Sequence, residues 1–186
     1  MSKRRSELLA IAANLFAERG FANVTVDDIG DAAGVSGPAL YHHFKGKEAL
    51  LGEMLIGISE YLLDGGRKVA VVAGDEVLER LVEFHARFAV DDRALITVHF
   101  HDLVHATEQD QRTVRTLQAR YVTVWVDELI REQPDHDRST ARATVQATFG
   151  LINSTPYSGS LPRQQMLDIL TRLALAALRS VPDSPA

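Results

Sequence analysis

This 186-residue chain is most strongly restricted by one short stretch, residues 25–47. Thr25 is a good helix N-cap, and Asp28 stands three places later, as in a capping box. Gly34 then supplies a residue that readily takes the left-handed backbone conformation in which helices often end. Ser36 follows closely and can cap a further helix. The pattern therefore predicts a helix, a glycine turn and a second helix, which is the plan of a helix-turn-helix motif.

The second predicted helix, residues 37–43, carries groups that suit contact with DNA. Its first turn is small and partly apolar, so the backbone can approach base edges and the methyl groups of thymine. Side-chain donors lie along its edge and just after it, and hydroxyl groups lie at the N-termini of both helices, where phosphate oxygens are readily bound. The predicted DNA-binding residues are Thr25, Ser36, Gly37, Pro38, Ala39, Tyr41, His42 and Lys47.

The distribution of charge is compatible with this prediction. The net charge of −5 is unusual for a DNA-binding protein. Residues 1–50, however, hold six basic and six acidic residues, so the acidic excess lies in residues 51–186. Lys3, Arg4 and Arg5 form a short basic arm, which is either a frayed terminus or a contact with phosphates or the minor groove.

A specific pattern of residues extends over the first part of the chain, from about Ser6 to Leu51. It comprises Phe16, Gly20-Phe21, Thr25, Ile29, Ala33-Gly34-Val35-Ser36, Leu40-Tyr41, His43-Phe44, Lys47-Glu48 and Leu50. In this pattern the chain resembles the TetR family of bacterial transcriptional repressors. Two departures concern Gly30, where the family usually has alanine, and Gly37-Pro38, which replaces a polar residue and glycine.

The resemblance implies an organisation in two domains. Residues 1–50 are expected to form the DNA-binding helix-turn-helix domain, and residues 51–186 the domain for effector binding and dimerisation. Such a protein acts in the cytoplasm as a homodimer on a palindromic site in double-stranded DNA, from which a small effector releases it. The two remaining classes are a lipid-binding module and an enzyme on the same fold.

Hydrophobic periodicity predicts an all-α fold with about nine helices. Outside the motif, the apolar stripes place helices at about 6–19, 75–92, 93–105, 110–132, 139–155 and 161–180. A further helix begins near Lys47, and Gly65-Gly66 is expected to kink or end it. No apolar run approaches the length of a membrane span, so no membrane partner is predicted.

Catalytic chemistry finds no support in the sequence. The chain has no cysteine, no glycine-rich loop that would hold phosphates and no serine in a nucleophile elbow. We therefore predict no catalytic residues, no cofactor and no enzymatic activity. His101 and His105 are one helical turn apart and could share a metal ion, but they lie on a face directed towards solvent. A solvated polar face is the preferred interpretation, and no metal site is predicted.

Aromatic and histidine side chains of the second part suit either a packed core or a ligand pocket, and periodicity does not separate the two. The resemblance favours a pocket for a small hydrophobic effector, and residues 95–125 resemble, more weakly, family members that sense acyl-CoA thioesters. A drug or a metal ion remains an alternative effector. The predicted ligand-binding residues are His85, Phe88, His99, Phe100, Leu103, Tyr121, Trp125 and Phe149. Phosphates of a ligand could meet Arg87, Arg93, Arg112 and Arg115, or these side chains are simply solvated.

The last two predicted helices carry apolar stripes that suit a four-helix bundle with two-fold symmetry. A homodimer is therefore expected. The predicted interface residues are Val145, Phe149, Ile152, Met166, Leu170, Leu173 and Ala177.

Overall fold

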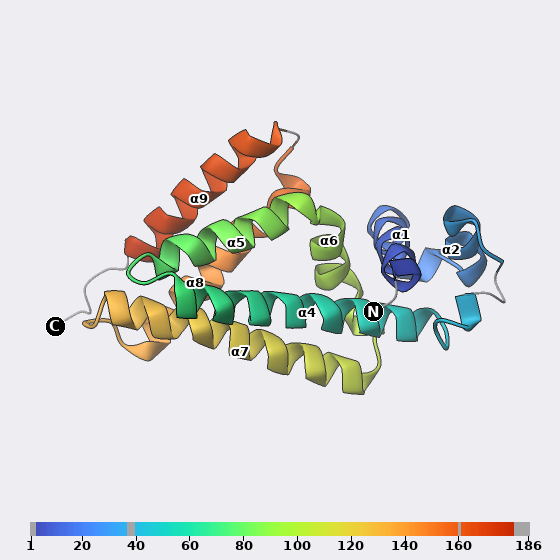
Figure 1. Cartoon of the computed structure of the whole chain (residues 1–186), viewed down its shortest axis with the longest axis horizontal. Coiled ribbons are helices and arrows are strands. Elements are labelled where there is room, and N and C mark those ends of the chain that lie inside the picture. Colours follow the sequence, from blue (N-terminus) through green and yellow to red (C-terminus); the bar gives the residue numbers. More distant parts are fainter. Residues whose placement is uncertain (1–2, 37–39, 160, 181–186) are drawn as a thin grey trace. The chain divides into compact units, whose positions relative to one another are not determined.

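The computed structural model describes residues 3–36, 40–159 and 161–180. These residues form eight α-helices and three short 3-10 helices, shown in Figure 1. The elements are α1 (Lys3–Arg19), η1 (Phe21–Asn23), α2 (Val26–Ala33), α4 (Lys47–Val72), α5 (Val77–Asp91), α6 (Arg93–Asp102), η2 (Leu103–His105), α7 (Glu108–Glu132), α8 (Arg138–Ile152), η3 (Thr155–Tyr157) and α9 (Arg163–Arg179). The predicted all-α fold is confirmed. No described helix combines the length and apolar character that crossing a bilayer requires.

The chain packs as two compact units that differ from a simple division at residue 50. The first unit contains residues 1–59 and 94–116, and the second contains residues 60–93 and 117–186. The helices α4 and α7 each contribute residues to both units. By packing, therefore, α6 belongs with the N-terminal helices and not with the larger C-terminal part.

The core of the first unit is built on one stripe of α1. Leu8, Ala12 and Phe16 are at most 1% exposed and recur at the helical spacing that the sequence predicted. They join buried side chains of α2, of the segment after it and of the start of α4, including Ile29 and Leu50. The helix-turn-helix segment is thus fixed by apolar burial on the side away from its exposed polar residues.

The second unit is centred on α5, which packs against α9 and α8. The buried residues of α9 recur along one face: Met166, Leu167, Leu170, Ala174 and Leu178. The buried residues of α8 do the same: Ala141, Val145, Thr148 and Ile152. Both stripes therefore lie in the core of a single protomer.

Of the two effects predicted for Gly65-Gly66, a kink or an end of the helix, the end is wrong, because α4 continues to Val72. A Cβ atom at Gly65 would lie 2.2 Å from the ring of Phe84, and one at Gly66 would lie 2.5 Å from the ring of Tyr121. Real side chains do not tolerate such distances. The glycines therefore serve close packing of aromatic rings against the α4 backbone, and not helix termination.

This packing predicts opposite effects of the same substitution at two glycines of α4. Gly66→Ala gains about 1 kcal/mol of helix propensity, but overpacking against the buried Tyr121 costs about 2 kcal/mol. We expect a net loss of about 1 kcal/mol in the free energy of unfolding. Gly57 is exposed with nothing within 4 Å of the added atom, so Gly57→Ala is expected to stabilise. Urea unfolding of the two variants checks this, and equal effects would contradict it.

Candidate nucleic-acid interface and effector site

The helix-turn-helix geometry follows the predicted capping chemistry. The hydroxyl oxygen of Thr25 accepts the backbone N–H of Asp28 at 3.1 Å, and the Asp28 carboxylate accepts the backbone N–H of Thr25 at 2.7 Å. The Thr25 hydroxyl also donates to the Asp28 carboxylate, and this bond, together with the one from the Thr25 backbone N–H, lowers the pKa of Asp28. At the other end, Gly34 has φ 65° and ψ 35°, and Val35 donates its N–H to the Gly30 carbonyl at 2.9 Å. Both ends of α2 are thus set by local hydrogen bonds, and the capping box and glycine stop are confirmed.

The segment after the turn exposes its polar residues and buries its apolar ones. Leu40 and Phe44, one helical turn apart, are 0% and 3% exposed. The Leu40 N–H bonds to the Ser36 carbonyl at 3.2 Å, in a helical pattern, and Ser36 itself is exposed. Tyr41 and His42 lie on the exposed side. The predicted base-reading residues Gly37, Pro38 and Ala39 lie outside the described residues.

Lys47 has an inward role that the sequence did not predict. Its Nζ donates to the carbonyl oxygens of Phe21 at 2.8 Å and Val24 at 2.7 Å, and it lies 4.2 Å from the centre of the Phe21 ring. An ammonium group has three N–H donors, and two are used by these carbonyls. Lys47 therefore connects the first turn of α4 to the turn between α1 and α2.

Removing this ammonium group is expected to loosen the motif. Lys47→Met keeps most of the aliphatic chain but leaves two carbonyls without their donor, and we expect a loss of about 1–2 kcal/mol in the free energy of unfolding. Lys45→Met is the matched control, because Lys45 is exposed. Thermal and urea unfolding of both variants test the assignment. Equal stability of the two variants would show that the carbonyl contacts contribute nothing.

The basic residues of the N-terminus are also used internally. The helix α1 begins at Lys3, so the frayed terminus is wrong, whereas a contact with phosphates or the minor groove stays a prediction. Arg4 donates to the carbonyl of Ala33, the last residue of α2, at 2.7 Å. Arg5 donates to the His43 carbonyl, pairs with Glu53 and lies 4.3 Å from the centre of the Phe44 ring. We call these contacts of Arg4 and Arg5 the N-terminal clasp.

The turn at Phe21 receives a second set of contacts, from the last residue of α6 and from η2, which follows it. The buried carboxylate of Asp102 accepts the Phe21 N–H at 3.4 Å. The ring of His105 stacks on Phe21, with 5.1 Å between ring centroids and 16° between planes. His105 therefore has a packing role. Among the described residues, no group of three or more histidine and acidic side chains is placed to hold a metal ion.

Five of the predicted ligand-binding residues gather in the second unit. His85, Tyr121 and Phe149 stack with centroid distances of 4.7–5.7 Å. Trp125 meets these three rings edge-on, and Phe88 contacts His85 in the same way at 6.1 Å. We call this group, with Asn153, the aromatic cluster.

The aromatic cluster contains a buried polar centre. His85 is 2% exposed, with Nδ1 3.1 Å from the Tyr121 hydroxyl and Nε2 3.0 Å from the Asn153 amide oxygen. Burial lowers the pKa of His85 to about 4, and the bond to Asn153 opposes this only in part. Burial likewise raises the pKa of Tyr121 well above its usual value. The ring of His85 is therefore neutral at physiological pH. Asn153 was not among the predicted residues, because its partner is 68 positions away in sequence.

The other three predicted ligand-binding residues belong to the first unit. His99 and Phe100 contact each other edge-on at 5.6 Å, and Phe100 is 56% exposed. Leu103 packs against the core of the first unit. By packing, the eight predicted residues are therefore divided between the two units.

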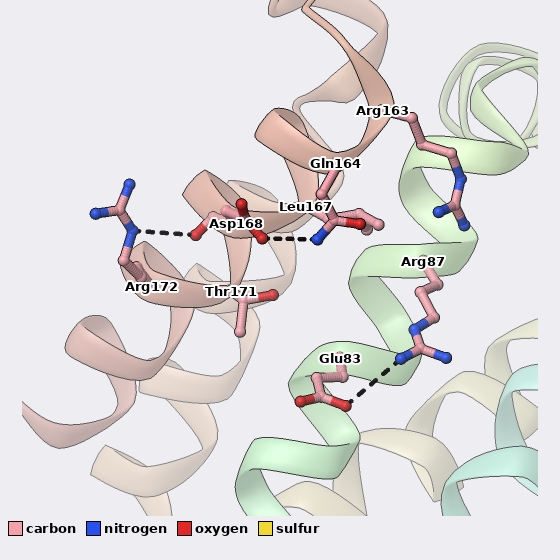
Figure 2. Close-up of a pocket in the computed structure, with 8 residues that line it drawn as sticks. All are labelled: Glu83, Arg87, Arg163, Gln164, Leu167, Asp168, Thr171 and Arg172. Atoms are coloured by element: carbon pink, nitrogen blue, oxygen red, sulfur yellow. Dashed lines mark hydrogen bonds and ion pairs between the residues drawn. The ribbon is translucent and has the colours of Figure 1, made fainter.

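A polar groove of about 630 Å³ lies between α5 and α9 (Figure 2). In this view Gln164 and Thr171 of α9 face α5, whereas Arg172 points away from it. The lining residues are Glu83, Arg87, Arg163, Gln164, Leu167, Asp168, Thr171 and Arg172.

Two of the three arginines at this groove have acidic partners, and the third, Arg172, donates to the backbone carbonyl of Asp168. Arg163 makes two hydrogen bonds of 2.6 Å to Asp91, and Arg87 pairs with Glu83 at 3.7 Å. The predicted phosphate-binding arginines elsewhere also bond within the protein: Arg93 to the Gly159 carbonyl, Arg112 to Glu108 and Arg115 to Gln111. The groove is thus close to charge balance and is not a strong anion site.

Most of the residues predicted for a dimer interface are buried inside the protomer. Val145, Ile152, Met166 and Leu170 are 0–4% exposed, so a partner subunit cannot reach them without unpacking the core. Phe149 belongs to the aromatic cluster, and Ala177 is half-buried. Only Leu173, at 51%, is well exposed. The sequence identified the apolar stripes correctly but assigned them to a partner when they pack on α5.

The capped α2, the glycine turn and the exposed edge after it define a helix-turn-helix DNA-binding protein, here joined to a larger helical unit. Family models agree: residues 8–54 match "Bacterial regulatory proteins, tetR family", and residues 72–178 match "Tetracyclin repressor-like, C-terminal domain". The chain belongs to the TetR family of transcriptional regulators, as its sequence pattern predicted, and is a regulator and not an enzyme.

Individual relatives are consistent with this assignment. The HTH-type transcriptional repressor KstR2 of Rhodococcus jostii is 34% identical over 128 residues, which cover 67% of this chain and 63% of that repressor. The match thus spans just under two thirds of the relative's length. The ketosteroid transcriptional regulator KstR2 of Mycobacterium tuberculosis superposes with a TM-score of 0.78 at 28% identity, covering 95% of each chain. A structure of AibR with isovaleryl coenzyme A and operator DNA shares the fold, with a TM-score of 0.70 at 18% identity over 92% of this chain and 97% of AibR.

Proposed function

We propose that this protein is a homodimeric repressor that binds a palindromic operator and leaves it when a small hydrophobic effector, such as an acyl-CoA or a steroid-derived intermediate, enters the second unit. The observation that carries the proposal is the pairing of a capped helix-turn-helix with a separate unit whose core contains a polar centre among aromatic rings. The relatives named as repressors, as a ketosteroid regulator and as a complex with isovaleryl coenzyme A support the same assignment.

We call residues 37–43 the reading segment. In the DNA-bound state, Tyr41 and His42 contact phosphate oxygens from its exposed edge. Thr25, Ser36 and the remaining N–H of Lys47 add contacts at the start of α2, at the turn and at the start of α4. Gly37, Pro38 and Ala39 read base edges in the major groove. The phosphate contacts set affinity and its dependence on salt, whereas the small residues set sequence preference.

The dimer interface uses the exposed sides of α8 and α9, opposite their buried stripes. Small and apolar residues recur there at helical spacing: Ala143, Ala147 and Gly150 on α8, and Ile169, Leu173 and Ala176 on α9. Small side chains allow helices of two protomers to approach closely, and a two-fold pair of these helices forms a four-helix bundle. Two reading segments then match the two halves of a palindrome.

Effector binding is coupled to DNA through α4, which is one continuous helix with residues in both units. Its first residue, Lys47, donates to the carbonyls of Phe21 and Val24, just before the helix-turn-helix motif. A shift of α4 would therefore displace that motif. An effector that prefers the released state a hundredfold, about 2.7 kcal/mol, weakens operator binding by up to the same factor per coupled site.

The experiment that tests the proposal begins with selection of an operator from random duplexes, followed by release assays with acyl-CoA thioesters of graded length and with steroid-derived thioesters. We expect a palindromic consensus, salt-sensitive binding and release in step with a change in Trp125 emission, because this is the only tryptophan. Release by metal ions or drug-like molecules alone would contradict the acyl effector, but the assignment as a repressor would stand. Absence of any preferred duplex would contradict the repressor itself.

A further inference from the structure

Trp125 has a buried donor that lacks an acceptor. Its indole is 0% exposed, and Nε1–H has no hydrogen-bond partner among the described residues. Leaving such a donor unpaired costs about 1–3 kcal/mol, and buried polar groups are normally paired. The indole lies edge-on to His85, Tyr121 and Phe149, with ring centroids 4.9–6.1 Å away. A cluster with only a structural role would be destabilised by this unpaired donor.

The neighbouring polar groups do not compensate, because the cluster holds more donors than acceptors. Neutral His85, Tyr121, Trp125 and Asn153 together carry five N–H or O–H hydrogens but only three acceptor atoms. When the Asn153 oxygen accepts from His85 Nε2, the Tyr121 hydroxyl donates to Nδ1, and the Asn153 amide hydrogens are in surplus. When the Asn153 amide is rotated by 180°, its nitrogen donates to His85 Nε2 and His85 Nδ1 donates to the Tyr121 oxygen. The hydroxyl hydrogen of Tyr121 is then left without an acceptor. In the first arrangement the Tyr121 oxygen keeps a free lone pair, but Trp125 Nε1–H is not placed to donate to it, so the indole donor is unpaired in both arrangements.

The polar centre is also electrically neutral. Burial keeps His85 uncharged at pH 7, and Tyr121 stays protonated for the same reason. No ion pair of the described residues involves any of the four side chains. A carboxylate placed here would be a buried charge without a cationic partner, which is strongly unfavourable.

From this balance we infer that the aromatic cluster binds a neutral carbonyl group of the effector, whose oxygen accepts a hydrogen bond from Trp125 Nε1–H, and rejects the corresponding free carboxylate. The inference rests on the proposed effector function and names the chemical class of the ligand: a thioester, ester or ketone on an apolar skeleton. The skeleton lies against Phe88 and Phe149. A thioester would therefore be recognised before its hydrolysis and ignored afterwards.

Access for such a ligand lies on the side of Tyr61. The Tyr61 ring is 56% exposed and contacts Phe84 at 5.5 Å and Phe88 at 6.3 Å. Phe84 in turn covers the α4 backbone at Gly65. Because the rings are closely packed, an entering ligand has to displace side chains. Tyr61 and Phe84, which lie at α4, are the first that it meets. Occupation of the cluster is thereby linked to the helix that carries the proposed signal.

The test uses three probes that share an acyl chain: the octanoyl thioester of N-acetylcysteamine, the matching S-octyl thioether, and octanoate. The thioether differs from the thioester only in lacking the carbonyl group. By calorimetric titration of the 186-residue protein we expect the thioester to bind about tenfold more tightly than the thioether, which corresponds to one buried hydrogen bond. Octanoate is expected to bind at least about a hundredfold more weakly than the thioester.

Nuclear magnetic resonance gives a readout that needs no variant. Labelled protein has a single indole N–H resonance, because Trp125 is the only tryptophan. The thioester is expected to move this resonance downfield, as hydrogen bonding does, whereas the thioether leaves the N–H without an acceptor. Trp125→Phe is the matching variant: it should lose the tenfold preference and bind the thioester no more tightly than the thioether.

The possible results separate the inference from the proposed function. If thioester and thioether bind equally and both release operator DNA, the carbonyl inference is wrong while the repressor with an apolar effector stands. Preferred binding of octanoate also overturns the inference. If none of the probes binds and none releases DNA, the acyl effector and the inference fail together. A Trp125→Phe protein that no longer binds operator is discounted, and the resonance shift of the wild type then decides.

Discussion

Replacing Leu173 with glutamate is expected to convert a dimer into monomers and to lower operator affinity by at least about a hundredfold at constant salt. Leu173 is 51% exposed on α9, opposite the stripe that packs on α5. A two-fold axis would place two such glutamates in the interface, and each buried, unpaired carboxylate costs several kcal/mol. Ala147→Glu on α8 should act in the same direction. Sedimentation at micromolar concentration and operator titration measure the two effects.

The control is Ala119→Glu, which makes the same chemical change at an exposed position of α7. This variant is expected to remain dimeric and to bind operator as the wild type does. All three proteins should show the same helical content, since none of the altered side chains lies in the protomer core. A Leu173→Glu protein that sediments as a stable dimer would remove these faces of α8 and α9 from the interface.

The buried histidine is expected to make the protein less stable in mild acid. The pKa of His85 is about 4 in the folded protein against 6.5 for an ordinary histidine. As pH falls below 6.5, the unfolded chain takes up a proton at this residue while the folded protein does not until about pH 4. Stability is therefore lost between pH 6.5 and 4 and is unaffected by this group above that window. Between pH 7 and 5 the loss is about 2 kcal/mol.

Denaturant unfolding at fixed protein concentration measures this loss. His85→Gln removes the titrating group, so its stability should change by about 2 kcal/mol less than that of the wild type between pH 7 and 5. His42→Gln, at an exposed histidine, should retain the wild-type dependence on pH. If the wild type and His85→Gln lose stability in parallel, His85 does not remain uncharged in the folded protein.

Features decided by neighbouring residues could be predicted from the sequence. Thr25 and Asp28 form the capping box, and Gly34 adopts the left-handed conformation, because each interaction closes within a few residues. The apolar stripes of α1 and α5 were equally visible, since helical spacing places their members on one face. The family assignment rests on the same local pattern and is confirmed for both parts of the chain.

Features decided by distant partners could not be predicted in this way. An apolar stripe shows that a helix face is buried but not by what, so Val145 and Met166 were assigned to a partner subunit although they pack within the protomer. The structural role of Lys47 depends on its bond to Phe21, and that of Gly66 on the ring of Tyr121. Both partners are far away in sequence. His99 and Phe100 share the composition of the aromatic cluster, but the chain places them in the other unit.

The N-terminal clasp has a practical consequence for anyone who shortens the protein. Arg4 and Arg5 look like a dispensable basic tail, yet they donate to the last carbonyl of α2 and to the carbonyl of His43, the last residue of the reading segment. A deletion that begins the chain at Ser6 would remove the contacts to the end of α2 and to the end of the reading segment, while removing no residue assigned to DNA contact. Trimmed versions should therefore appear as poor DNA binders with an intact effector response. Purification tags are better attached at the other terminus.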